Sequence, residues 1–134
     1  MMNYSGSFMS SASNFIKPLV PGPIIRDESV YRTTISIDPV SSIFEGHFPE
    51  FPLLPGIVLI DLIHELVTKI LDQPVMLSEA SNIKFLKSVV PENDNELCIA
   101  LHISHEENLL KVNANITDPS EKEIFKGQFS YTVG

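Results

Sequence analysis

Residues 46–56, GHFPEFPLLPG, lead directly into an apolar run over residues 57–71, IVLIDLIHELVTKIL. Pro55 suits the first turn of a helix, because the N–H that proline lacks has no partner inside a helix at that position. Pro74 prevents the helix from continuing. We therefore predict one helix over residues 56–71. Its apolar side chains cover almost the whole circumference, which is typical of a helix buried inside a domain.

The segments around this helix have the alternating pattern of half-buried strands. Alternation runs through residues 31–38, and again through 96–104, 110–116 and 125–133, with turns predicted at 105–108 and 118–120. Residues 76–87 are predicted to form a long, irregular strand. Three successive alternating runs joined by short turns indicate an antiparallel meander. The predicted fold class is α+β, with an antiparallel sheet wrapped around one long central helix and an open sheet edge that favours a dimer.

The size and composition of the chain limit the choice of function. Its 134 residues suggest a single domain over residues 24–134, preceded by a partly flexible arm over residues 1–23 that is rich in Ser, Asn and Gly. A net charge of −8 argues against a general nucleic-acid-binding surface. No segment has the pattern of a membrane span or of a secretory signal. The single cysteine, Cys98, cannot form an internal disulfide, so we expect a cytoplasmic location.

Three residues near the start of the predicted helix are candidates for acid–base chemistry. His47 lies in the proline-spaced loop, and Asp61 lies among apolar side chains in the second turn of the helix. Burial there disfavours the charged form of the carboxyl group and raises its pKa, as suits a general acid at neutral pH. Gly56 offers a free backbone N–H at the helix N-terminus, where an enolate oxygen can be stabilised. These are the parts needed for acid–base chemistry next to a polarised carbonyl.

The run His47-Phe48-Pro49-x-x-Pro52-x-x-Pro55-Gly56 resembles the signature of the β-hydroxyacyl-[acyl-carrier-protein] dehydratases of the FabZ/FabA type, which have the hotdog fold. Residues 83–91 and 125–129 resemble two further segments of that family. The resemblance covers most of residues 31–133, but only the first segment is dense. It implies that the chain is a divergent member of this family.

The resemblance implies a role for each matching residue. His47 takes the proton from the α-carbon, Asp61 protonates the leaving hydroxyl, and the Gly56 N–H holds the thioester oxygen. It also implies a 3-hydroxyacyl substrate on an acyl carrier protein, no cofactor or metal, and a homo-oligomer (dimer or trimer of dimers) with its site between subunits. A further set of residues is assigned to an acyl tunnel or to carrier docking: Phe48, Phe51, Leu54 and Phe85 to the tunnel, and Lys84 and Lys87 to docking.

Other interpretations stay open at this point. A hotdog thioesterase could use Asp61 or Glu65 to activate water, although such enzymes generally lack the His47 motif. A non-catalytic subunit that pairs with an active homologue is a second alternative. His64 and Glu65 replace the small residue and the glutamine usual after the carboxylate, and this change keeps that alternative open. A metal site built from His47, Asp61 and His64 has no further ligand spacing to support it.

Overall fold

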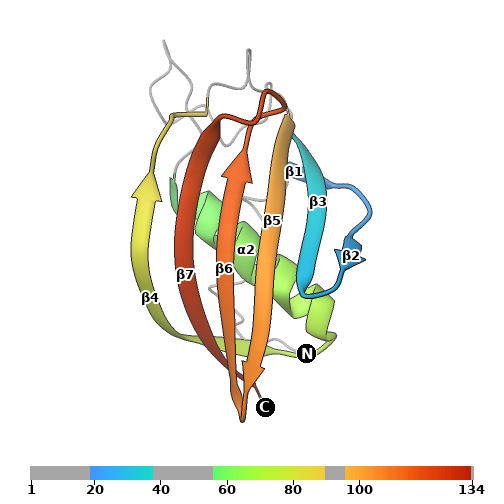
Figure 1. The fold of residues 1–134 in the computed structure, drawn as a ribbon, viewed down its shortest axis with the longest axis vertical. Coiled ribbons are helices and arrows are strands. Elements are labelled where there is room, and N and C mark those ends of the chain that lie inside the picture. Colours follow the sequence, from blue (N-terminus) through green and yellow to red (C-terminus); the bar gives the residue numbers. More distant parts are fainter. Residues whose placement is uncertain (1–18, 38–55, 90–95, 134) are drawn as a thin grey trace.

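The computed structural model describes residues 19–37, 56–89 and 96–133. Within them, one helix lies behind an antiparallel sheet of seven strands (Figure 1). The elements in chain order are β1 (Leu19–Pro21), β2 (Ile25–Asp27), β3 (Val30–Ile37), α2 (Gly56–Leu71), β4 (Val75–Phe85), β5 (Glu96–Glu106), β6 (Leu109–Thr117) and β7 (Glu123–Val133). The strand order is β1-β3-β5-β6-β7-β4, and β2 also pairs with β3. The predicted architecture, including the meander of β5, β6 and β7, is confirmed.

Two details differ from the sequence prediction. β5 continues to Glu106, which pairs with Leu109, so the turn contains only Glu107 and Asn108. Glu107 has a φ of 60°, and this left-handed conformation allows a two-residue hairpin turn. β1 and β2 were not predicted, because three residues are too few to show a period. Of the predicted N-terminal arm, residues Leu19–Pro21 pair with β3.

The hydrophobic core lies between α2 and one face of the sheet. α2 buries Val58, Leu59, Leu62, Ile63, Leu66 and Val67, and the alternate residues of β5, β6 and β7 face it. The other residues of these strands point away from the helix and form the outer face of the sheet. Of the helices in the described ranges, none is both long and apolar enough to cross a membrane.

β4 forms one edge of the sheet, since β7 is its only strand partner among the described residues. Its register shifts twice against β7, between Leu77 and Glu79 and between Ser81 and Lys84, which confirms the predicted irregularity. Most of its side chains are exposed, including Met76 and Phe85. An 11-residue edge strand that exposes large apolar side chains is a surface on which a further strand can pair.

Candidate active site

Asp61 is buried in the second turn of α2, with 6% of its surface exposed. It lies five residues after Gly56, roughly 7.5 Å further along the helix axis. Burial raises the pKa of Asp61, and the negative charge of Glu65 raises it further. A carboxyl group in this setting keeps its proton to a higher pH than a solvated aspartate does. The burial of Asp61 and the raised pKa expected from the sequence are therefore present in this structure.

His64 and Glu65 follow Asp61 by one helical turn, so the three residues lie on neighbouring parts of the α2 surface. The imidazole of His64 packs at a tilt against the ring of Tyr131 on β7, with ring centroids 5.7 Å apart. Burial lowers the pKa of His64, which keeps the ring neutral over a wider pH range. Among the described residues, no group of three or more His, Cys, Asp or Glu side chains has the arrangement of a metal site.

The start of α2 lies beside a hollow of about 370 Å³. Gly56 and Leu59 of α2 form one wall, and residues 85–89, which begin with the last residue of β4, form the other. The Phe85 ring lies directly against Gly56, because a Cβ added at Gly56 would stand 2.6 Å from Phe85 Cε1. Glycine at this position therefore allows the ring to approach the helix N-terminus closely. The hollow brings together two of the predicted site residues, Gly56 and Phe85.

A network of hydrogen bonds fixes the 85–89 wall of this hollow. The Leu86 N–H donates to the Ile124 carbonyl at 2.8 Å, and Lys87 Nζ lies 3.0 Å from Asp118 Oδ2. Asp118 Oδ1 also accepts from the backbone N–H groups of Ser120 and Lys122. The bond from the Lys122 N–H, followed by that from Lys87, holds the pKa of Asp118 below its ordinary value. Asp118 thus connects the β6–β7 turn, through Ser120 and Lys122, to Lys87 in the wall of the hollow.

The predicted site residues lie in three places. Gly56, Phe85 and Lys87 line the hollow, and Asp61 lies one turn further along α2. Lys84 points to the outer face of the sheet, where it lines a separate hollow with Lys126. His47, Phe48, Phe51 and Leu54 lie outside the described residues. The sequence analysis did not identify Asp118: its turn was recognised, but the contact with Lys87 joins positions 31 residues apart.

The effect of the Glu65 charge on Asp61 can be tested through the pH dependence of the reaction rate. Glu65→Gln removes a charge that raises the pKa of Asp61, so this pKa falls toward its ordinary value. If Asp61 must be protonated to act, the alkaline limb of the rate–pH profile moves to lower pH in the variant. Asp72→Asn is the matched control, because it removes one negative charge at an exposed residue beyond the end of α2. Identical profiles for Glu65→Gln and the wild type would contradict this coupling.

Comparison with known proteins identifies a matching family model and solved structures of the same fold. Residues 23–128 match the family model ApeI-like, described as ApeI dehydratase. The dehydratase heterocomplex ApeI:P from Xenorhabdus doucetiae has 21% identity and a TM-score of 0.69, over 85% of this chain and 97% of that one. A hypothetical thioesterase with coenzyme A from Streptococcus pneumoniae TIGR4 has 16% identity and a TM-score of 0.67, over 96% and 94% of the two chains.

A third solved structure, an uncharacterised protein from Erwinia carotovora subsp. atroseptica, is 24% identical with a TM-score of 0.62, over 86% of this chain and 94% of that chain. At these identities the structural matches establish the fold alone. They confirm the hotdog fold that the sequence resemblance implied.

Proposed function

Because the chain belongs to the ApeI-like dehydratase family, we propose that it is a hydro-lyase that converts a 3-hydroxyacyl thioester into a trans-2-enoyl thioester. The observation that carries the proposal is the buried Asp61, with its raised pKa, one turn beyond the hollow at Gly56. A solvated aspartate is ionised at neutral pH and has no proton to donate. Burial of Asp61 favours the protonated form that a leaving hydroxyl needs.

In the proposed reaction the imidazole of His47 takes the proton from the α-carbon. The electrons of that C–H bond form the double bond, while the bond from the β-carbon to its hydroxyl breaks. Asp61 gives its proton to the departing oxygen, which leaves as water. The Gly56 N–H, at the positive end of the helix dipole, donates to the thioester oxygen as negative charge develops on it. Proton exchange with solvent then restores both side chains, and no oxidant or reductant is required.

The substrate is proposed to be carried by an acyl carrier protein, in fatty-acid or related lipid or polyketide synthesis in the cytoplasm. The exposed ammonium of Lys84 suits the acidic surface of such a carrier. Lys87, the second docking residue proposed from the sequence, is engaged with Asp118. We therefore assign Lys87 a part in holding the wall of the hollow as well. Phe85, together with Phe48, Phe51 and Leu54, is proposed to line the acyl tunnel.

A second copy of the chain is proposed to pair with the edge of β4 opposite β7, where the described residues contain no further strand. The large apolar side chains exposed along β4 and at the start of α2 would then be covered: Ile57, Met76, Leu77, Phe85 and Leu86. Ala80→Pro removes a backbone donor from the middle of β4 that faces away from β7, because Ala80 pairs with Phe129, whose own backbone groups bond to β6. This substitution should weaken the association. We expect sedimentation to shift the variant from dimer toward monomer, with its circular dichroism unchanged. An unchanged dimer would place the interface elsewhere.

Two alternatives have specific support. A thioesterase is compatible with the structural likeness to the Streptococcus pneumoniae protein. A subunit of a heterocomplex is compatible with the likeness to ApeI:P. In a thioesterase, Asp61 would activate water rather than donate a proton, and this role requires the ionised form that burial disfavours. The raised pKa of Asp61 therefore favours the dehydratase.

The decisive experiment is mass spectrometry of 3-hydroxyacyl chains of several lengths, loaded on an acyl carrier protein and incubated with the wild type or His47→Ala. Loss of one water with the wild type only is the expected result. Release of the free acid would establish the thioesterase instead. If the wild type is inactive on every chain, the assay is repeated with an added active homologue, to test for a non-catalytic subunit. Full turnover by His47→Ala would overturn the assignment of the base.

A further inference from the structure

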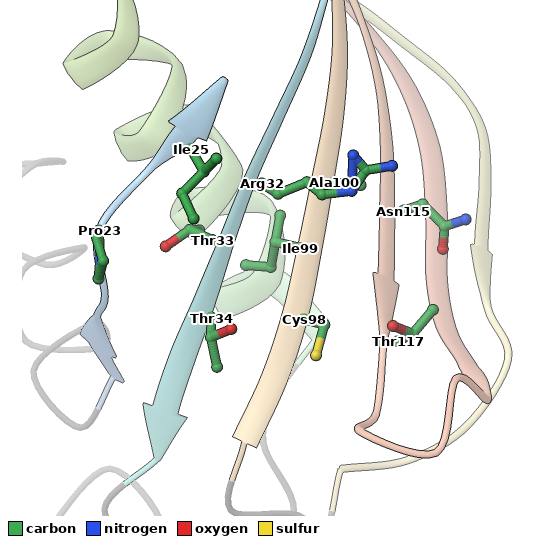
Figure 2. A pocket seen from close by; sticks show the side chains of 10 residues that line it. All are labelled: Pro23, Ile25, Arg32, Thr33, Thr34, Cys98, Ile99, Ala100, Asn115 and Thr117. Carbon is green, nitrogen blue, oxygen red and sulfur yellow. The ribbon is translucent and has the colours of Figure 1, made fainter. Parts of the chain in front are cut away.

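The outer face of the sheet, turned away from α2, has two neighbouring hollows that the proposed reaction does not use. The first, of about 400 Å³, lies over β3, β5 and β6, with Arg32, Cys98 and Ala100 among its lining residues. Figure 2 shows the Arg32 side chain extending across β5 at Ala100, on the side of Asn115. The second hollow, of about 370 Å³, lies over β4, β6 and β7 and includes Lys84 and Lys126. Asn115 lines both hollows and joins them.

The charged side chains among the described residues that line the two hollows are all positive. The strand register places Arg32, Ala100, Asn115, Lys126 and Lys84 in one row across five adjacent strands. Strands lie roughly 5 Å apart, so Lys84 and Lys126 are near neighbours. His102 also lines the second hollow. None of the described residues that line either hollow is Asp or Glu, although the chain has 17 acidic and 9 basic residues.

The side chain of Asn115 marks the junction of the two hollows. Its Oδ1 is buried and accepts no hydrogen bond from the described residues. A buried carbonyl oxygen without a donor is unfavourable, so a ligand that supplies an N–H or O–H there is stabilised by that contact. Neighbouring amides, Asn113 and Gln128, add donors to the lysine side of the site. In the first hollow, which Arg32 lines, Ala100 contributes a small side chain and Ile25 an apolar one.

We propose that the two hollows form one binding site for an organic phosphate whose body carries a hydrogen-bond donor. The phosphate lies in the hollow of Lys84 and Lys126, where ammonium and amide groups donate to its oxygens. The body of the ligand donates to Asn115 Oδ1 and rests on Ala100 beside Arg32. The site is on the side of the sheet opposite α2, so a bound phosphate does not contact Asp61, but it shares Lys84 with the proposed docking surface for the carrier.

One acidic group competes for this site. Glu123 Oε2 lies 2.8 Å from Lys126 Nζ and neutralises part of its charge. A bound phosphate must share or displace this ion pair, which is largely exposed and therefore weak. Glu123→Gln should strengthen phosphate binding, whereas Lys126→Gln should weaken it. These opposite signs distinguish a phosphate site from a general loss of structure.

The test is an amide NMR titration of the full chain with inorganic phosphate, adenosine monophosphate and glucose 6-phosphate in parallel. We expect shifts at Asn115 and its neighbours, and at least one organic phosphate should bind more tightly than phosphate alone. The titrations with adenosine monophosphate and glucose 6-phosphate show whether the hollow of Arg32 accepts a nucleoside or a sugar. Arg32→Gln should weaken the organic phosphates more than inorganic phosphate, because only their bodies reach it.

Lys111→Gln is the matched control for Lys126→Gln. Lys111 is also an exposed lysine of the outer face and is also paired with a glutamate, Glu106 at 3.6 Å, but it lines neither hollow. Lys126→Gln should weaken binding about tenfold, the loss of one charge-assisted contact, and Lys111→Gln should leave it unchanged. Equal losses in both variants, no shifts with any of the three probes, or shifts confined to α2 would overturn the proposal.

Discussion

Replacing Asp61 by Asn should lower turnover of a 3-hydroxyacyl thioester by roughly 100- to 10,000-fold, the range that a positioned acid or base contributes. The amide has nearly the same shape as the carboxyl group but cannot release a proton to the departing hydroxyl. The measurement is a single-turnover assay at saturating enzyme, which reports the chemical step. Turnover within tenfold of the wild type would remove Asp61 from the role of acid.

The same substitution should stabilise the fold at neutral pH. The pKa of Asp61 is higher in the folded chain than in the unfolded chain. The resulting stabilisation is fully present below the unfolded value and is lost as pH rises through the folded pKa. The stability of Asp61→Asn relative to the wild type should therefore increase with pH across that range. Urea unfolding at several pH values measures this change.

Asp72→Asn is the control for both readouts, because it makes the same chemical change at an exposed position. Asp72 has a φ of 55°, a conformation that asparagine also adopts readily. Neither turnover nor the pH dependence of stability should change appreciably in this variant. A comparable loss of activity in Asp72→Asn would mean that net charge, and not the acid, controls the rate.

The largest expected effect on stability follows from Phe125→Ala. The Phe125 side chain is fully buried, and it lies edge-on to Phe85 at 5.2 Å and parallel to Phe129 at 6.3 Å. Truncation of a fully buried phenylalanine lowers the free energy of unfolding by about 3–5 kcal/mol, from lost burial and the remaining cavity. Since a domain is stabilised by only about 5–15 kcal/mol, this is a large fraction of the total.

Phe85→Ala is the matched comparison for Phe125→Ala, because the Phe85 ring belongs to the same cluster but is 55% exposed. Phe85→Ala should lower the free energy of unfolding much less than Phe125→Ala does. It should also enlarge the hollow beside Gly56. We expect Phe85→Ala to change the preferred acyl length more than the stability. Equal destabilisation by the two substitutions would show that Phe85 is part of the core rather than a wall of the site.

The sequence was sufficient for the main elements and for the dehydratase family. The helix begins and ends at the predicted residues, since Pro55 and Pro74 limit it from both sides. Strict alternation predicted β5, β6 and β7, because one face of each strand is buried. The dehydratase resemblance rested on the run from His47 to Gly56, and the family match agrees with it. β1 and β2 were missed because their pairing with β3 comes from tertiary contacts and not from a local pattern.

Only the tertiary structure decided which distant residues meet. Local sequence shows that Asp61 is surrounded by apolar neighbours, but the close packing of Phe85 on Gly56 joins two elements 29 positions apart. The pairing of Lys87 with Asp118 and the row from Arg32 to Lys84 depend in the same way on strand order and register. Periodicity reports which face of an element is buried, whereas the neighbour across that face is set by the packing of the whole chain.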